Sequence, residues 1–146
     1  RRSALLPAPA ACGAGTVVAT ERLGWCAAPS VTWAGAAERP LPRGRLAGPC
    51  AVRMSAGAAL GAAGLPWREA FVGGGIAAVG AAVAAGLAVA ALAPSTAPAG
   101  VMEAGARLGL PDLPLTRVVL HARPLRGPAA DALRALAAAY RGPGSR

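Results

Sequence analysis

The sequence contains no lysine, asparagine or glutamine, and aromatic residues make up only 3% of its 146 residues. All 15 of its basic residues are therefore arginines, which give a formal net charge of +9. These arginines are spread along the chain, and no stretch combines them with regularly spaced aromatic residues. Nucleic-acid-binding surfaces gather their basic residues on one face or along one helix. The sequence therefore offers little support for direct nucleic-acid binding by this chain.

Metal ligands and catalytic groups are also scarce. The three cysteines, Cys12, Cys26 and Cys50, form no CxxC pair, and His121 is the single histidine. A zinc site needs more ligands than this, and an odd cysteine count does not fit a disulfide framework, so we expect free thiols in a reducing compartment. The sequence has no G-x-S-x-G elbow, no Walker A motif and no complete G-x-G-x-x-G. We therefore expect no metal, no cofactor and no catalytic residue, and hence no enzyme.

A long uncharged run, 71–93, is the feature that decides between a membrane protein and a water-soluble one. It is long enough to span a bilayer. Its eight large apolar residues favour insertion by roughly 2–5 kcal/mol, while its five glycines weaken a continuous helix by a similar total, about 0.8–1 kcal/mol each. We therefore interpret it as separate elements and expect no membrane association. The predicted elements are a strand at 69–73, a glycine turn at 73–75, a helix with apolar residues at 76, 79 and 83 that Gly86 ends, and a buried strand at 87–92 closed by Pro94.

The same alternation continues on either side of the run. Before the run we predict a buried strand at 23–29, a loop at 31–48, a strand at 50–54, and a helix at 56–63 with Ser55 as N-cap and Gly64 at its end. After the run we predict a short helical stretch within 97–114 and a strand at 117–123. The last predicted element is a helix from Pro128 with an apolar stripe of Leu133, Leu136 and Tyr140. Residues 143–146 are expected to be a disordered tail. Strands alternating with helices indicate an α/β fold with a mostly parallel sheet.

In such a sheet, ligands bind beyond the carboxyl ends of the strands. Two predicted strand-to-helix turns lie there, and their free backbone N–H groups suit a carboxylate or phosphate. The candidate binding residues are Arg53, Met54 and Ser55 at the first turn, and Gly73, Gly74 and Gly75 at the second. Arg53 could add a bidentate contact to an anion. Each has a plainer alternative: Ser55 as a helix cap only, the glycines as a turn only, and Arg53 as a surface residue.

The order of these segments resembles one family. The stretch "GPCAVRMSAGAALGAAGLPWREAFVGGGIAAVGAAVAAGLAVAALAPS", with "ERLGWCAAPS" before it and "LGLPDLPLTRVVLHAR" after it, looks like the effector-binding domain of LysR-type transcriptional regulators. The family's helix reads like "AAVAAGLGVALLP", where this chain has "AAVAAGLAVAALAP" at 81–94. Ala88 departs from that pattern by replacing the third residue of the family's GLGV. The resemblance covers about residues 1–142.

The resemblance implies a type II fold similar to periplasmic binding proteins, with an effector cleft between two α/β subdomains. Residues 24–116 would form the second subdomain, and 1–22 with 117–142 would form part of the first. The family's winged helix-turn-helix and the opening elements of its first subdomain have no counterpart here, so the first subdomain would be incomplete. Arg1 and Arg2 would map to a segment bordering the cleft, which adds Arg2 to the candidate effector-binding residues.

The resemblance also implies partners. The chain would be the cytoplasmic sensing domain of a bacterial regulator that binds a small, anionic effector and forms a homodimer or higher homo-oligomer, with 56–63 as the candidate pairing helix. DNA would be bound only through the winged helix-turn-helix. The alternatives are an exported solute-binding protein of the same fold and a small membrane protein spanning at 71–93.

Overall fold

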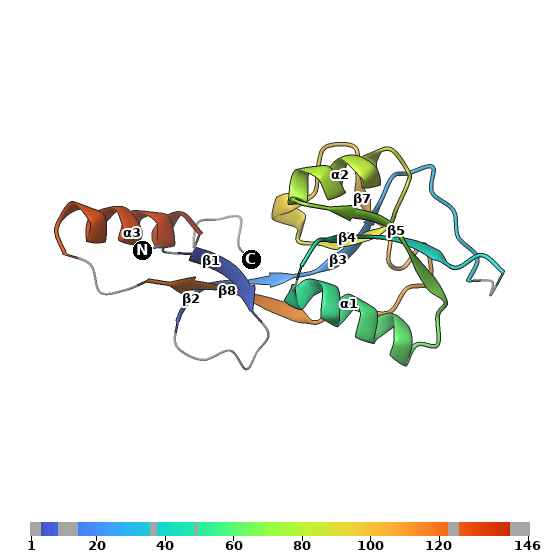
Figure 1. The fold of residues 1–146 in the computed structure, drawn as a ribbon, viewed down its shortest axis with the longest axis horizontal. Helices are drawn as coiled ribbons and strands as arrows, with labels where there is room; N and C mark the ends of the chain where they lie inside the picture. Colours follow the sequence, from blue (N-terminus) through green and yellow to red (C-terminus); the bar gives the residue numbers. More distant parts are fainter. Residues whose placement is uncertain (1–3, 9–14, 36–37, 49, 123–125, 141–146) are drawn as a thin grey trace. The chain divides into compact units, whose positions relative to one another are not determined.

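The computed structural model describes residues 4–8, 15–35, 38–48, 50–122 and 126–140. The chain divides into two compact units. The larger unit is Arg22–Pro114, and the smaller unit combines Arg1–Glu21 with Leu115–Arg146 (Figure 1). Among the described residues, the larger unit has two sheets and two buried apolar clusters, and the smaller unit has one of each.

Within its described residues, the larger unit contains five strands, two α-helices and a short 3-10 helix. In chain order these are β3 (Gly24–Ala27), β4 (Leu41–Leu46), α1 (Ala51–Ala62), β5 (Trp67–Gly73), α2 (Ile76–Ala84), β6 (Ala90–Leu92), η1 (Pro94–Thr96) and β7 (Met102–Glu103). Strands β4 and β5 pair in parallel, whereas β3 pairs antiparallel with both β6 and β7. A parallel bridge between Arg43 and Val89 connects the two sets, with the Val89 amide donating to Pro42 O at 2.7 Å.

The prediction of a mostly parallel sheet is wrong. Helical crossovers join β4 to β5 and β5 to β6, and such crossovers join parallel strands. In the part of the chain that is described, no α-helix connects β3 or β7 to its neighbours along the chain, and β3 pairs antiparallel with both β6 and β7. The α/β alternation was therefore recognised correctly, but it governs only the β4–β5–β6 part.

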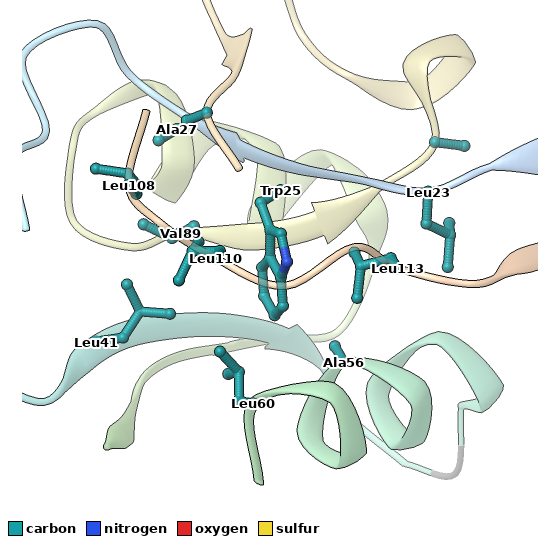
Figure 2. Packing of buried hydrophobic residues seen from close by; sticks show 12 residues of the cluster. Leu23, Trp25, Ala27, Leu41, Ala56, Leu60, Val89, Leu108, Leu110 and Leu113 are labelled. Atoms are coloured by element: carbon teal, nitrogen blue, oxygen red, sulfur yellow. The ribbon is translucent and has the colours of Figure 1, made fainter. Parts of the chain in front are cut away.

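The two helices of the larger unit cover opposite faces of its strands (Figure 1). Residues that follow one another along a strand point to opposite faces. Accordingly, Trp25 packs with Ala56 and Leu60 of α1 (Figure 2), while its neighbour Cys26 packs with Val79 and Val83 of α2. Both faces of the strands are thus buried under helices.

The uncharged run folds as separate elements, as predicted. It contains the end of β5, helix α2 and strand β6. Gly86 follows the α2 C-cap with φ +74° and donates to Val83 O at 3.0 Å, and Leu87 N donates to Ala82 O at 3.0 Å, which completes a Schellman motif. Among the described residues, no helix combines the length and hydropathy needed to cross a membrane. Strand β6, at Ala90–Leu92, is shorter than the buried strand predicted at 87–92. Leu87, which was predicted to lie in that buried strand, is 62% exposed.

Helix α1 begins earlier than predicted, which corrects two assignments. The predicted strand at 50–54 forms the N-cap and first turn of α1, with Cys50 as the N-cap. The strand lies instead in the predicted loop, at Leu41–Leu46. Residues 52, 56 and 60 are apolar, four apart, and face the core together, which is a helical spacing that the strand assignment overlooked. Gly64, with φ +64°, ends this helix as predicted.

The segment 97–114 contains less helix than predicted. It forms a hydrogen-bonded turn at 99–100, where Val101 N donates to Pro98 O, and a longer one at 105–109, where Leu108 N donates to Ala104 O and Leu110 N donates to Gly105 O. Strand β7 occupies two residues just before the longer turn. Gly109, with φ +64°, interrupts any continuation of the turn into a helix.

The smaller unit contains β1 (Ala4–Ala8), β2 (Thr16–Arg22), β8 (Leu115–His121) and α3 (Pro128–Tyr140), with strand order β1-β8-β2. The last helix starts at Pro128, as predicted, with Asp131 in its first turn. Its predicted stripe is wrong in part: Leu133 and Ala137 face the core, whereas Leu136 and Tyr140 are 43% and 39% exposed. The predicted tail, 143–146, lies outside the described residues.

Candidate functional site

The carboxyl ends of β4 and β5 lie side by side. Leu46 pairs with Gly73, and the Ala47 amide donates to Gly73 O at 2.8 Å. The chain then leaves β4 toward α1 on one face and leaves β5 toward α2 on the other face (Figure 1). Adjacent parallel strands whose connections diverge to opposite faces open a crevice at their carboxyl ends, where α/β proteins bind ligands.

Both helices present uncapped N-termini at this edge. The N-cap residues are Cys50 for α1 and Gly75 for α2, and neither makes a side-chain cap hydrogen bond. Neither helix has an acidic residue in its first turn. The first N–H groups of a helix have no partner within the helix and carry partial positive charge. This edge therefore favours a negatively charged group.

Three of the predicted residues, Arg53, Met54 and Ser55, lie in the first two turns of α1. The exposed Arg53 side chain turns back toward the helix start, where Nη1 donates to Gly48 O at 3.3 Å. Met54 is 70% exposed. The N-cap role predicted for Ser55 is wrong, because α1 starts four residues before it and the half-buried serine lies inside the helix.

The glycine turn lies where it was predicted. Gly73 ends β5 and is buried, and a Cβ there would lie 3.0 Å from Val79 Cγ2 and 3.2 Å from Val79 N. Close packing of the strand end against α2 thus explains Gly73. Gly74 and Gly75 are exposed, and nothing lies within 4 Å of where their Cβ atoms would be. Their backbone is therefore open to a ligand.

Arginines outnumber carboxylates around this edge. Arg45 of β4 and Glu69 of β5 form a two-point ion pair, Nε with Oε1 and Nη2 with Oε2 at 2.9 Å. The hydrogen bonds from Arg45 lower the pKa of the Glu69 carboxyl, and Arg53 and Arg43 add smaller effects in the same direction. With Glu69 already paired to Arg45, the positive charges of Arg43 and Arg53 remain in excess.

Arg43 is a charged residue that sequence reasoning missed, since it fell in the predicted loop. It is 2% exposed, and its Nη2 donates to Arg53 O at 2.6 Å. Burial lowers its pKa, with Glu69 acting in the opposite direction. A Cβ on Gly57 would lie 3.2 Å from Nη1, so this glycine admits the guanidinium beneath α1. Arg43 thereby ties the first turn of α1 to β4.

The remaining candidates do not join this edge. Arg1 and Arg2 lie outside the described residues. His121 lies on β8, where it pairs with Ala4 in the smaller unit. Cys26 and Cys50 are free thiols, and Cys26 is buried as predicted, while Cys12 is outside the described residues. Within the part of the chain that is described, no group of three His, Cys, Asp or Glu residues could hold a metal ion.

Comparison with known proteins rests on structure alone. No protein-family model matches this sequence. No curated protein sequence matches it either. Two similar solved structures are DarR of Vibrio fischeri in complex with DNA, described as revealing the transcriptional activation mechanism of LTTR family members, and the apo regulatory domain of HypT from Salmonella typhimurium. The TM-scores are 0.66 and 0.63, at 10% and 14% sequence identity.

The chain has the fold of a LysR-type regulatory domain. The matches cover 92% and 94% of this chain, and they cover 49% of the DarR chain and 73% of the HypT domain. This confirms the mixed α/β fold that the segment order indicated. The chain spans about half the length of DarR, so the activity of a whole regulator is a matter of proposal.

Proposed function

We propose that this chain is the effector-sensing part of a LysR-type regulator, and that it binds a small anionic molecule at the carboxyl ends of β4 and β5. The observation that carries the proposal is the pair of uncapped helix N-termini at the ends of two adjacent parallel strands. An anion there would be bound by backbone N–H groups, and no catalytic group is required of the protein.

The charges around the site support an anionic ligand. Arg53 lies at the start of α1, and Arg43 is buried beneath the same turn. The nearby carboxylate, Glu69, is already paired with Arg45. A carboxylate or phosphate would therefore meet N–H donors and a guanidinium, with the repulsion from Glu69 partly cancelled. The exposed backbone of Gly74 and Gly75 would supply the second set of contacts to the anion. Gly73 allows this turn to pack closely against Val79 of α2.

The wider function follows from the fold and remains part of the proposal. Effector binding would shift the population between two arrangements of a cytoplasmic regulator, which requires the effector to bind one arrangement more tightly. DNA recognition would be the task of a winged helix-turn-helix and not of residues 1–146. A homodimer or higher homo-oligomer is expected, with the predicted pairing segment 56–63, which overlaps α1, as the candidate interface.

The test is anion binding by the full chain and by a variant with a methyl group added to the turn. Isothermal titration with inorganic phosphate, acetate and succinate should show saturable binding. Gly74→Ala should weaken it at least about tenfold, because the methyl group would occupy space next to the turn amides. This variant should fold normally, since the turn has room for a Cβ there and its φ is not positive.

Gly61→Ala is the matched control, because Gly61 also has open space around it but lies near the C-terminus of α1, whereas the candidate site is at the N-terminus of that helix. Arg53→Gln should weaken anion binding, whereas Arg134→Gln, which removes the same charge from α3, should not. Unchanged affinity in both Gly74→Ala and Arg53→Gln, or no saturable binding of any of the three anions, would contradict the proposal.

A further inference from the structure

The larger unit contains a cavity that shares no residue with the candidate anion site. Its volume is about 330 Å³, which lies at the lower end of the roughly 300–1,000 Å³ typical of small-molecule sites. The lining comes from residues 22–25 at the start of β3, from Pro94 of η1, from Glu103 of β7 and from the turn and connection at 105–113. All of it belongs to Arg22–Pro114.

The floor of this cavity is apolar and held in place. The cavity is lined by Leu23, Trp25, Leu110 and Leu113, and each of them is buried to at least nine-tenths. Figure 2 shows these four side chains within the buried apolar cluster. The Trp25 indole Nε1 donates to Pro111 O at 2.8 Å, and the Ala104 amide donates to Trp25 O at 2.7 Å. These bonds fix the indole and the turn around it, so an apolar ligand group would meet a surface that is already formed.

Acidic residues outnumber arginines in the cavity lining, whereas arginines outnumber acidic residues in the chain as a whole. The sequence has 15 arginines and six acidic residues, yet this lining contains Glu103, Asp112 and one arginine, Arg22. In the described part of the chain, none of these three side chains enters an ion pair. The local charge is therefore −1 on a protein of net charge +9, which favours a cation at this place.

Two glycines hold the Glu103 carboxylate at the cavity. A Cβ on Gly105 would lie 2.7 Å from Glu103 Oε1, and one on Gly24 would lie 3.1 Å from Glu103 Cγ. Gly105 N also donates to Oε1 at 2.8 Å. The carboxylate thus has a defined position, and in the described residues it makes no other side-chain hydrogen bond.

We propose that this cavity binds a small organic cation, with its ammonium or guanidinium group at Glu103 and Asp112 and its apolar body against Trp25 and the surrounding leucines. Arg22 lines the same cavity and could in addition take a carboxylate, as in an amino acid. This inference does not depend on the anion site, since the residues and the charge of the ligand both differ.

The experiment follows the indole N–H signals of the ¹⁵N-labelled full chain during titration. The chain has three tryptophans, and Trp25 is the one that lines the cavity, so Trp33 and Trp67 serve as internal controls. Trp33→Phe and Trp67→Phe assign the signals. The probes are L-norvaline and two compounds that each retain one of its charged groups, butylammonium and pentanoate.

Butylammonium should shift the Trp25 signal saturably and leave the other two unchanged, and pentanoate should bind at least about tenfold more weakly. Glu103→Gln and Asp112→Asn should each weaken butylammonium binding by about tenfold, as expected for one lost charge-assisted contact. Glu38→Gln removes an exposed carboxylate outside the cavity and should have no effect. Tighter binding of norvaline that Arg22→Gln removes would assign amino-acid-like ligands, and equal binding would assign simple amines.

Three outcomes would overturn the inference. These are no saturable shift with butylammonium and norvaline up to tens of millimolar, pentanoate binding as strongly as butylammonium, and full binding in both carboxamide variants. None of these bears on phosphate, acetate or succinate binding at Gly74, so failure here and failure of the anion site can be told apart.

Discussion

The guanidinium carbon of Arg43 lies 4.7 Å from the centre of the Trp67 ring. Arg43 is the more buried partner, at 2% exposure against 37% for Trp67. The arginine extends from β4, the ring extends from the first residue of β5, and the same guanidinium donates to Arg53 O in α1. One side chain thus connects both parallel strands to the helix that borders the candidate anion site.

This geometry predicts an energetic coupling between Arg43 and Trp67. A cation over an aromatic ring contributes about 0.5–1 kcal/mol when exposed and about 2 kcal/mol when desolvated. Trp67→Leu should therefore destabilise the Arg43 protein more than it destabilises an Arg43→Met protein, by about 0.5–2 kcal/mol. Urea unfolding of the four proteins measures this difference. Equal losses in the two backgrounds would show that the two side chains only pack together.

The Arg45–Glu69 pair predicts how stability depends on pH. Because the hydrogen bonds from Arg45 lower the pKa of Glu69 in the folded state, the pair stabilises the fold at pH values above the ordinary glutamate value of 4.5. This contribution is lost as the pH falls below 4.5 and through the lowered folded-state pKa. Glu69→Gln should remove that part of the acid sensitivity. Urea midpoints of both proteins between pH 7 and pH 3 test this, and parallel pH profiles would contradict it.

The elements that the sequence predicted well are those whose ends carry local signals. Gly64 and Gly86 mark the ends of α1 and α2 because a residue with positive φ is needed there. Pro128 marks the start of α3. The β4 strand was missed because Pro40 and Pro42 suggested a loop, and Pro42 is tolerated near the strand's beginning, where its carbonyl still accepts from Val89.

Of the two strand-to-helix turns that carry the candidate site, one lies where the sequence predicted it and the other does not. The glycine turn at 73–75 was found because its residues are local and distinctive. The other turn was placed at Ser55, because a serine before a run of alanines is typical of a helix start. The N-cap of this helix is instead Cys50, whose side chain makes no capping hydrogen bond. The burial of Arg43 and the cavity at Trp25 depend on contacts between distant segments, which no local pattern encodes.

Two glycines at the end of α1 should respond to alanine in opposite directions. Gly64 has φ +64° with nothing within 4 Å of its Cβ position, so Gly64→Ala introduces backbone strain alone and should cost about 1–2 kcal/mol. Gly61 has equal space but lies within the helix, so Gly61→Ala should stabilise by up to about 1 kcal/mol. Thermal or urea unfolding measures both, and equal effects of the two substitutions would show that α1 does not end here.

The two described cysteines should differ sharply in reactivity. Burial raises the pKa of the Cys26 thiol, with Glu103 adding to the effect, so little of the reactive thiolate forms at pH 8. Cys50 is the half-buried N-cap residue of α1, so a reagent reaches its sulfur more easily than that of the buried Cys26. Iodoacetamide should therefore modify Cys50 at least about tenfold faster than Cys26, as measured by peptide mass spectrometry. In concentrated urea the two rates should converge, because unfolding exposes both thiols. Similar rates without denaturant would show that the β3 core around Cys26 opens readily, and that the floor formed by its neighbour Trp25 is not fixed.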